Sequence, residues 1–260
     1  MKIIDNFKDF FKDNHIDLEN KKLSIAVSTG IDSSVLLDMF LKLQKEINFT
    51  LIVCHVNHHK RKQSEEEENY IKKYTEEKGI KLYIKDLFFD NNQNFQEEAR
   101  NRRYEFFDEV MEKEQADYLV LAHHADDNIE TILMRILRGS SLTGYAGIKE
   151  ISQRKNYLVL RPLLRSSREM ISLYQKENNI KYYEDESNSK TDYLRNKLRI
   201  EVIPKLKEIM PNLDEKMNEF SEKVLMGSTI VNEKRDEFIH TFVKNDNNNI
   251  VINFFIISPL

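Results

Sequence analysis

The feature that most constrains the fold is an alternation of short apolar runs with longer helical stretches over the first 140 residues. The apolar runs cover residues 23–27, 51–56, 81–84 and 118–122, and the helical stretches cover 33–46, 65–78, 95–115 and 126–138. Apolar runs without polar alternation are typical of strands that are buried on both faces of a parallel sheet. We therefore predict an α/β fold with a doubly wound parallel sheet.

The last part of the chain follows a different pattern. From about residue 200 apolar side chains recur at helical spacing, and Pro204 and Pro211 act as breaks. Residues 250–260 form an apolar run that is typical of a strand. We predict two domains: an α/β domain over residues 1–205, and a small helical domain over residues 206–260 that ends in an incomplete strand.

Composition excludes several classes of protein. No apolar run approaches the ~20 residues that a membrane span requires, and the N-terminus mixes apolar residues with acids and lysines, unlike a secretory signal. The single cysteine, Cys54, cannot form an intrachain disulfide or a cysteine-only metal site. We predict a cytoplasmic protein with no membrane partner. Because the net charge is -4, a nucleic-acid partner would have to bind local basic patches.

The strongest functional signal is a polar loop between the first predicted strand and the following helix. It reads Ser28-Thr29-Gly30-Ile31-Asp32-Ser33. Backbone N–H groups and hydroxyls at such a junction form a cradle for an anion. The loop lacks the Gly-Lys-Ser/Thr ending of a Walker A loop and the spaced glycines of a dinucleotide fingerprint. For so short a motif, an ordinary capped turn is the alternative.

Further polar residues follow other predicted strands and should reach the same edge of the sheet. His55 ends the second strand, and His123, His124 and Asp127 follow the fourth. Hard oxygen ligands beside a phosphate loop suit Mg²⁺. Two alternatives stay open: a carboxylate that only complements the helix dipole, and a zinc site of Cys54 and the histidines, whose spacing matches no standard ligand set.

The order of these motifs resembles a known family. The loop is similar to the Ser-Gly-Gly-x-Asp-Ser loop of the N-type ATP pyrophosphatases, and later blocks narrow the resemblance to the tRNA(Ile)-lysidine synthase family. The blocks are His55-Val56-Asn57-His58, Glu97-Glu98-Ala99-Arg100-Asn101-Arg102-Arg103-Tyr104, His123-His124-Ala125-Asp126-Asp127-Asn128-Ile129-Glu130-Thr131, Arg138-Gly139-Ser140-Ser141-Leu142-Thr143-Gly144, Arg161-Pro162-Leu163-Leu164, Asp185-Glu186-Ser187-Asn188, Arg195-Asn196 and Arg199. They occur in collinear order over roughly residues 20–210.

The resemblance implies a two-step ligase. ATP would adenylate the wobble cytidine of a CAU-anticodon tRNA(Ile) with release of pyrophosphate, and L-lysine would then displace AMP to give lysidine. The implied cofactors are ATP and Mg²⁺, the implied partners are tRNA(Ile) and L-lysine, and a homodimer is an open alternative to a monomer. The rival predictions are a tRNA thiolase of the same superfamily and a nucleotide-binding module without catalysis.

The resemblance also implies roles for individual residues. Catalytic roles are implied for Asp32, Asp127 and Arg100, Mg²⁺ binding for Asp32 and Asp127, ATP contacts for Ser28, Thr29, Gly30, Ile31, Asp32, Ser33, His55 and His123, and tRNA contacts for Arg103, Arg138, Arg195 and Arg199.

Two departures from the family pattern are visible. Thr29 stands where the family has glycine, and a Cβ there could crowd the phosphates or need a φ that threonine adopts poorly. Family members commonly continue into further domains, so we expect this chain to be a short or truncated form.

Overall fold

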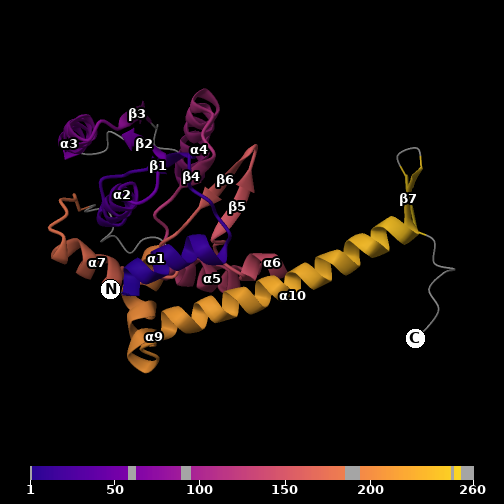
Figure 1. Cartoon of the computed structure of the whole chain (residues 1–260). Helices are drawn as coiled ribbons and strands as arrows, with labels where there is room; N and C mark the ends of the chain where they lie inside the picture. The colour runs from indigo at the N-terminus through magenta and orange to yellow at the C-terminus, as the bar shows by residue number, and fades with distance from the viewer. Residues whose placement is uncertain (1, 58–62, 89–94, 185–193, 247–248, 253–260) are drawn as a thin grey trace.

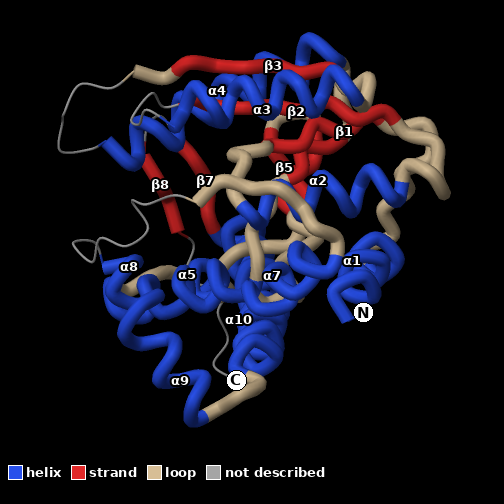
Figure 2. The backbone as a smooth tube through the Cα atoms, turned by 90° about the vertical axis from the view of Figure 1, so that its left-hand side faces the viewer, coloured by secondary structure: helices blue, strands red, loops and turns tan. Residues whose placement is uncertain are grey.

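The computed structural model describes residues 2–57, 63–88, 95–184, 194–246 and 249–252. The strands of its main sheet are β1 (Lys22–Ala26), β2 (Thr50–Asn57), β3 (Lys81–Asp86), β4 (Tyr118–Val120), β5 (Ile151–Arg154) and β6 (Tyr157–Leu160). They lie in the order β3-β2-β1-β4-β6-β5, and all neighbouring pairs are parallel except β5 with β6 (Figures 1 and 2). The predicted α/β class is therefore confirmed, with an antiparallel strand added at one edge.

Helices flank this sheet and continue into the C-terminal region. They are α1 (Lys2–Asp13), α2 (Ile31–Leu43), α3 (Gln63–Glu77), α4 (Phe95–Glu114), α5 (Ala125–Arg138), α6 (Leu142–Tyr145), α7 (Arg168–Glu177), α8 (Leu194–Lys197), the π-helical turn η2 (Leu198–Val202), α9 (Ile203–Ile209) and α10 (Leu213–Phe242). The three helical stretches predicted between the first four strands correspond to α2, α3 and α4, and the stretch predicted after the fourth strand corresponds to α5. The apolar periodicity therefore located each of them.

Successive residues of the central strands face two separate cores. In β2, Leu51 and Val53 join a core that includes residues of α1, α2 and α7. Ile52 and Cys54, which point to the other face, join a core that includes α4. Because helices cover both faces, most positions of these strands are apolar, and polar exceptions such as Ser24 and His55 are buried as well. This explains the absence of regular polar alternation in the sequence.

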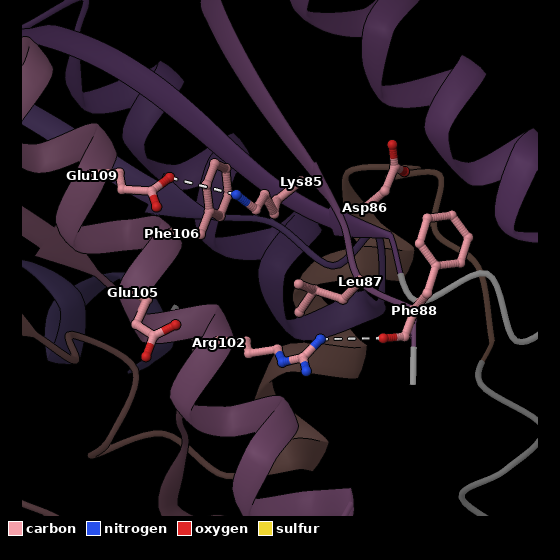
Figure 3. A pocket seen from close by; sticks show the side chains of 8 residues that line it. All are labelled: Lys85, Asp86, Leu87, Phe88, Arg102, Glu105, Phe106 and Glu109. Carbon is pink, nitrogen blue, oxygen red and sulfur yellow. Dashed lines mark hydrogen bonds and ion pairs between the residues drawn. The ribbon is translucent and has the colours of Figure 1, made fainter. Parts of the chain in front are cut away.

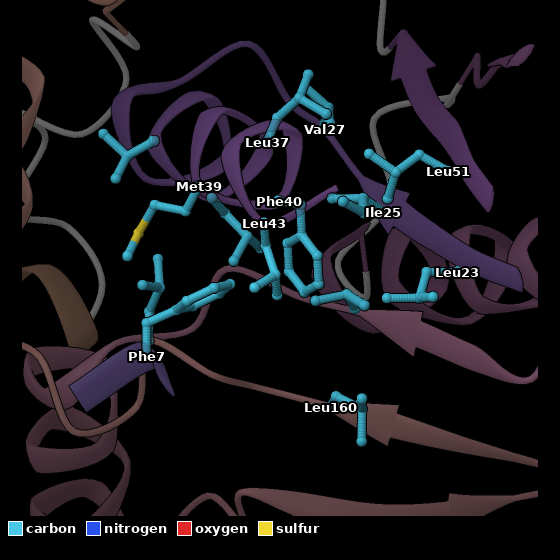
Figure 4. Close-up of a cluster of buried hydrophobic side chains, with 14 of the residues drawn as sticks. Phe7, Leu23, Ile25, Val27, Leu37, Met39, Phe40, Leu43, Leu51 and Leu160 are labelled. Atoms are coloured by element: carbon cyan, nitrogen blue, oxygen red, sulfur yellow. The ribbon is translucent and has the colours of Figure 1, made fainter. Parts of the chain in front are cut away.

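Helix α1 was not predicted, although it supplies several aromatic side chains to the first core. Its Ile3, Phe7 and Phe10 are buried on one helical face. Figure 4 shows Phe7 beside Phe40 of α2, and their ring centroids are 5.1 Å apart. Burying a side chain of this size contributes roughly 1.5–3 kcal/mol. The contact packs α1 against α2, and the first turn of α2 includes Ile31, Asp32 and Ser33 of the polar loop identified in the sequence.

The strand order places that loop at a crevice in the sheet. From β1 the chain adds β2 and β3 on one side, and β4 and β6 lie on the other side. Ligands of doubly wound sheets bind at such a reversal, outside the carboxyl ends of the strands. The loop after β1 and the segment after β4 both leave the sheet at these carboxyl ends. Residues 27–34 and 121–130 are thereby brought to one edge of the sheet.

Helix α10 extends well beyond the α/β body (Figure 1). At its start, Leu213 is buried in a cluster with Ile129 of α5, whereas Met226 and Ile230 further along are exposed. Strands β7 (Val243–Asp246) and β8 (Asn249–Ile252) then pair antiparallel. A helical C-terminal region is thus confirmed. The domain boundary at residue 205 falls inside α9 and stays a prediction, and residues 253–260 of the predicted strand lie outside the described residues.

Among the described helices, none combines the length and the apolar content that a bilayer crossing demands.

Candidate active site

The loop from β1 to α2 folds back on itself through serine hydroxyls. The backbone N–H of Ser28 donates to Ser33 Oγ at 3.1 Å, and the Ser33 hydroxyl donates to the Gly30 carbonyl at 3.1 Å. Gly30 is the N-cap of α2 and provides no capping side chain. The N–H groups of the first turn of a helix need outside acceptors, and the helix dipole makes this end positive. The loop therefore has the form of an anion cradle.

Thr29 adopts a backbone conformation that is rare for a threonine. Its φ is 63°, in the left-handed region, where a β-branched residue is strained by roughly 1–2 kcal/mol. Its side chain is 1 % exposed and donates to the Ser28 carbonyl, while the N–H of Tyr183 donates to the Thr29 carbonyl at 3.0 Å. The prediction that this position needs an unfavourable φ is confirmed.

The two carboxylates predicted to bind metal meet across a single imidazole. Asp32 lies in the first turn of α2, and Asp127 lies in the first turn of α5. His124 Nε2 is 3.8 Å from Asp32 Oδ1 and 3.5 Å from Asp127 Oδ2. The N–H of His124 also donates to Asp127 Oδ2 at 3.1 Å. Two helix N-termini thus bring their acids to one point at the sheet edge.

Burial and charge shift the pKa values of this group in different directions. Burial raises the pKa of Asp32, although the charges of His124 and Arg168 oppose the shift. Burial acts in the same direction on Asp127, but His124 and His123 outweigh it and lower the Asp127 pKa. For His124, burial is outweighed by the nearby aspartates, so its pKa is raised. The imidazolium is therefore favoured where it compensates the carboxylates.

Three residues outside the predicted set hold this arrangement together. Asp126 accepts a hydrogen bond from Lys207 Nζ at 2.6 Å and one from the N–H of Arg168 at 2.8 Å. The Arg168 guanidinium also contacts Asp32 Oδ2 at 2.6 Å. Burial would raise the pKa of Asp126, but the nearby His124 imidazole and the hydrogen bonds from Lys207 and from the N–H of Arg168 lower it. Arg168 therefore connects the first turns of α2 and α5.

Glu130 is a further candidate, missed as a site residue although its place on the same helical face as Asp127 is visible in the sequence. Its side chain has no exposed surface. Arg199 binds it through two nitrogens, with Nε–Oε1 at 2.5 Å and Nη2–Oε2 at 3.1 Å, and Arg195 Nε lies 3.2 Å from Oε2. Arg199 Nη2 is also 3.3 Å from Asp127 Oδ1. The structure thus brings Arg195 and Arg199 beside the acidic residues.

Arginines lie on the other side of the site, around His123. Burial lowers the His123 pKa to about 4, and the charges of Arg161, Arg103 and Arg100 act in the same direction while Asp127 opposes them. His123 is therefore neutral near pH 7. Burial also lowers the pKa of Arg103. The charges of Arg100 and Arg103 therefore act on His123, while a shared role of these three residues stays a prediction.

Two predicted residues have other positions. His55 is buried, and its Nδ1 bonds to the Val27 carbonyl at 2.8 Å, so it supports the start of the loop. Arg138 lies at the end of α5, about 16 Å along the helix axis from Asp127, and is exposed. The structure does not bring Arg138 to the site. The motif residues His58 and 185–188 lie outside the described residues.

The residues at the two helix N-termini fit Mg²⁺. Asp32 Oδ1 is buried and has no hydrogen-bond partner, and Mg²⁺ commonly binds one or two carboxylates together with phosphate oxygens. Among the described residues no group of three or more His, Cys, Asp or Glu side chains is arranged to hold a metal, and His58 and His59 of the zinc alternative lie outside them. Burial raises the pKa of the Cys54 thiol to about 12.

Comparison with known proteins agrees with this geometry. A family model for the PP-loop domain matches residues 1–206, so the chain belongs to the PP-loop family, and membership implies the use of ATP.

Within that class, the chain is similar to enzymes with one specific name. It is 43 % identical over 198 residues to the tRNA(Ile)-lysidine synthase of Staphylococcus aureus (strain N315). The matched region covers 75 % of this chain and 45 % of the relative. It is 40 % identical over 204 residues to the enzyme of the same name from Streptococcus agalactiae serotype V, with 78 % and 46 % covered. The chain spans about half the length of the curated relatives that it matches.

A solved structure supports the fold alone. It is a U34-tRNA thiolase of Methanococcus maripaludis with its [4Fe-4S] cluster, and it shares 20 % sequence identity with this chain. The TM-score is 0.73, with 86 % of this chain and 78 % of the other covered.

Proposed function

We propose that this chain carries the catalytic part of an ATP-dependent ligase that joins L-lysine to the wobble cytidine of a CAU-anticodon tRNA(Ile), forming lysidine. The observation that carries the proposal is the meeting of Asp32 and Asp127 across His124, next to the uncapped N-terminus of α2. The names of the curated relatives supply the substrate.

In the first half-reaction the C2 oxygen of the cytidine attacks the α-phosphorus of ATP, the bond from the α-phosphorus to the bridging oxygen breaks, and pyrophosphate leaves. The N–H groups and serine hydroxyls at residues 28–33 bind the phosphates, and Arg100 and Arg103 offset their negative charge. Mg²⁺ held by Asp32 and Asp127 would add further neutralisation of the phosphate oxygens. Because the protein forms no covalent bond, rate depends on positioning and charge stabilisation.

In the second half-reaction the ε-amine of L-lysine attacks C2 of the adenylated cytidine, the C2–O bond breaks, and AMP leaves with that oxygen. We place Arg103, Arg138, Arg195 and Arg199 on the tRNA. Glu130 holds Arg195 and Arg199, and a guanidinium has five N–H donors, so these arginines retain donors for phosphate oxygens. In this proposal Glu130 is a positioning residue.

The thiolase alternative is not favoured by the cysteine content. Thiolases of this superfamily generally use paired cysteines or an iron–sulfur cluster, whereas this sequence has one cysteine. Cys54 is buried, lies 3.1 Å from Ser24 Oγ, and has a pKa raised to about 12 by burial. A thiolate nucleophile is therefore disfavoured at this position.

The products of ATP cleavage test the proposed reaction type. Incubation with ATP, L-lysine and CAU-anticodon tRNA should give AMP and pyrophosphate, separated by chromatography, at a rate that depends on the tRNA. A matched reaction with a tRNA that lacks cytidine at the wobble position should give neither product. ADP and phosphate as main products would contradict the proposal.

A further inference from the structure

A polar cleft of 420 Å³ lies between α4 and the β5–β6 hairpin, beside the site described above. Its lining residues include Arg100, Asn101, Tyr104, Glu105, Arg154 and Arg161. Arg161 directly follows β6 at the carboxyl end of the strands, and its charge contributes to the lowered pKa of His123. The cleft therefore begins at the site and continues along α4.

Arg161 lines this cleft and is itself largely buried. Its side chain is 8 % exposed, and Nη1 donates to the Lys149 carbonyl at 2.9 Å and to Ser152 Oγ at 3.1 Å. Its Nε is buried and has no hydrogen-bond partner. A buried donor without an acceptor is unfavourable. The buried guanidinium places a positive charge at the wall of the cleft, and an anion bound there would offset this charge.

The neighbouring arginines are held in fixed positions by an aromatic ring and a carboxylate. The guanidinium carbons of Arg100 and Arg154 lie 5.0 and 4.8 Å from the centroid of the Tyr104 ring. Asp108 binds Arg154 through two hydrogen bonds of 2.8 and 2.7 Å. A guanidinium stacked on a ring keeps N–H donors at its edge, and these suit the oxygens of a phosphate.

A second hollow of 320 Å³, between α4 and the end of β3, offers a contrast (Figure 3). There the charged side chains contact groups of the protein: Lys85 Nζ lies 3.6 Å from Glu109 Oε2, and Arg102 donates to the Phe88 carbonyl at 3.3 Å. In the cleft, Arg161 keeps an unpaired nitrogen and Glu105 is the carboxylate among the lining residues. The cleft is therefore the better anion site of the two.

We propose that this cleft binds the phosphodiester backbone of single-stranded RNA next to the target cytidine. This inference rests on the proposed function, which supplies the RNA. A pocket for a small ligand is usually lined by apolar side chains, whereas this cleft is lined mainly by polar ones. A chain with a net charge of -4 must also hold a polyanion through local basic groups. Recognition of single-stranded RNA combines such phosphate contacts with aromatic rings.

Asn101 allows a test that does not alter the arginines. It is exposed on α4 and lines the cleft, and glutamate or lysine is compatible with a helix. Binding of a CAU anticodon stem-loop RNA is titrated with salt for the wild type, N101E and N101K. The control is K73Q on α3, where Lys73 is exposed and 3.9 Å from Glu77; it changes the net charge by the same amount as N101E.

We expect N101E to weaken RNA binding and to flatten the slope of log affinity against log salt by roughly 0.7, the value for one phosphate on a single strand. N101K should steepen the slope by about the same amount, and K73Q should match the wild type. If N101E and N101K both match K73Q, RNA does not bind in the cleft. If N101E alters the KM for ATP but not RNA binding, the cleft serves nucleotide phosphates and the proposal is wrong.

The outcome is separable from the fate of the proposed function. Shifted slopes with no lysidine formed would retain the RNA cleft and remove the ligase assignment. Lysidine formation by the wild type, together with unshifted slopes in the variants, would retain the ligase assignment and remove the RNA cleft.

Discussion

The two helix N-termini at the site differ in how their backbone N–H groups are used. At α2, the N-cap is Gly30, and no side chain caps the first turn. At α5, the N–H of the N-cap His124 is bonded to Asp127, and Asp126 is bonded to Lys207 and Arg168. The first end is left available to a ligand, whereas the second is filled by the protein's own charges. Each helix carries one of the two carboxylates, Asp32 on α2 and Asp127 on α5, but the first turn of α2 alone lacks a capping side chain.

The largest expected effect comes from removing either carboxylate between these two ends. Asp32→Ala and Asp127→Ala should each lower turnover at least ~100-fold, or about 2.7 kcal/mol, because charge stabilisation at the transferring phosphate is lost. Turnover is measured as tRNA-dependent release of pyrophosphate, and thermal melts must show both variants folded. A near-normal rate for Asp127→Ala would mean that this carboxylate only caps α5.

A second effect distinguishes RNA contacts from internal support. Replacing Arg195 and Arg199 together with glutamine should flatten the salt dependence of tRNA binding by about 1.4–1.8 and leave ATP binding intact. A salt titration with the wild type and the double variant measures it. An unchanged slope would remove both arginines from the RNA interface and leave the pairing with Glu130 as their role.

The buried acid of α5 should contribute more to stability than an exposed one. Glu130→Gln keeps the size of the side chain but removes the charge that two arginines contact, so unfolding should become easier by roughly 1–3 kcal/mol. The matched control is Glu215→Gln, because Glu215 forms an exposed pair with Lys2, where less than about 1 kcal/mol is expected. Urea denaturation measures the free energy of unfolding of the wild type and of both variants. Equal losses would show that burial adds nothing at Glu130.

The smallest effect is expected in the loop before α2. Thr29→Gly removes a Cβ from a residue with a φ of 63°, so backbone strain of about 1–2 kcal/mol is relieved. The greater conformational entropy of glycine in the unfolded chain lowers the stability by about 0.4–1 kcal/mol in the opposite direction. Thermal melts should show equal or slightly higher stability, and turnover should be unchanged or higher. A clear loss of both would indicate that the packed threonine side chain supports the loop.

The sequence was informative where the signal was periodic or local. Apolar runs located the first four strands, which are parallel. The composition of residues 28–33 predicted an anion cradle, and this role stays a prediction. Helix α1 was not predicted, although its buried residues Ile3, Phe7 and Phe10 recur at helical spacing. The β5–β6 hairpin was missed because its strands are four residues each, too short for a clear pattern.

The supporting contacts of the site could not be predicted from the sequence, for a different reason. Asp32 meets His124 and Arg168 only because α2, α5 and α7 pack at one sheet edge. The pairing of Glu130 with Arg199 joins residues 69 positions apart. Neither contact has a local pattern, so both depend on the tertiary fold.

The most direct measurement is mass spectrometry of the nucleosides from CAU-anticodon tRNA(Ile) after incubation with this chain, ATP and L-lysine. We expect lysidine in place of the wobble cytidine, formed together with equal amounts of AMP and pyrophosphate, and no product when L-lysine is omitted. Unmodified cytidine in the presence of a folded chain that binds both ATP and the tRNA would contradict the proposed function.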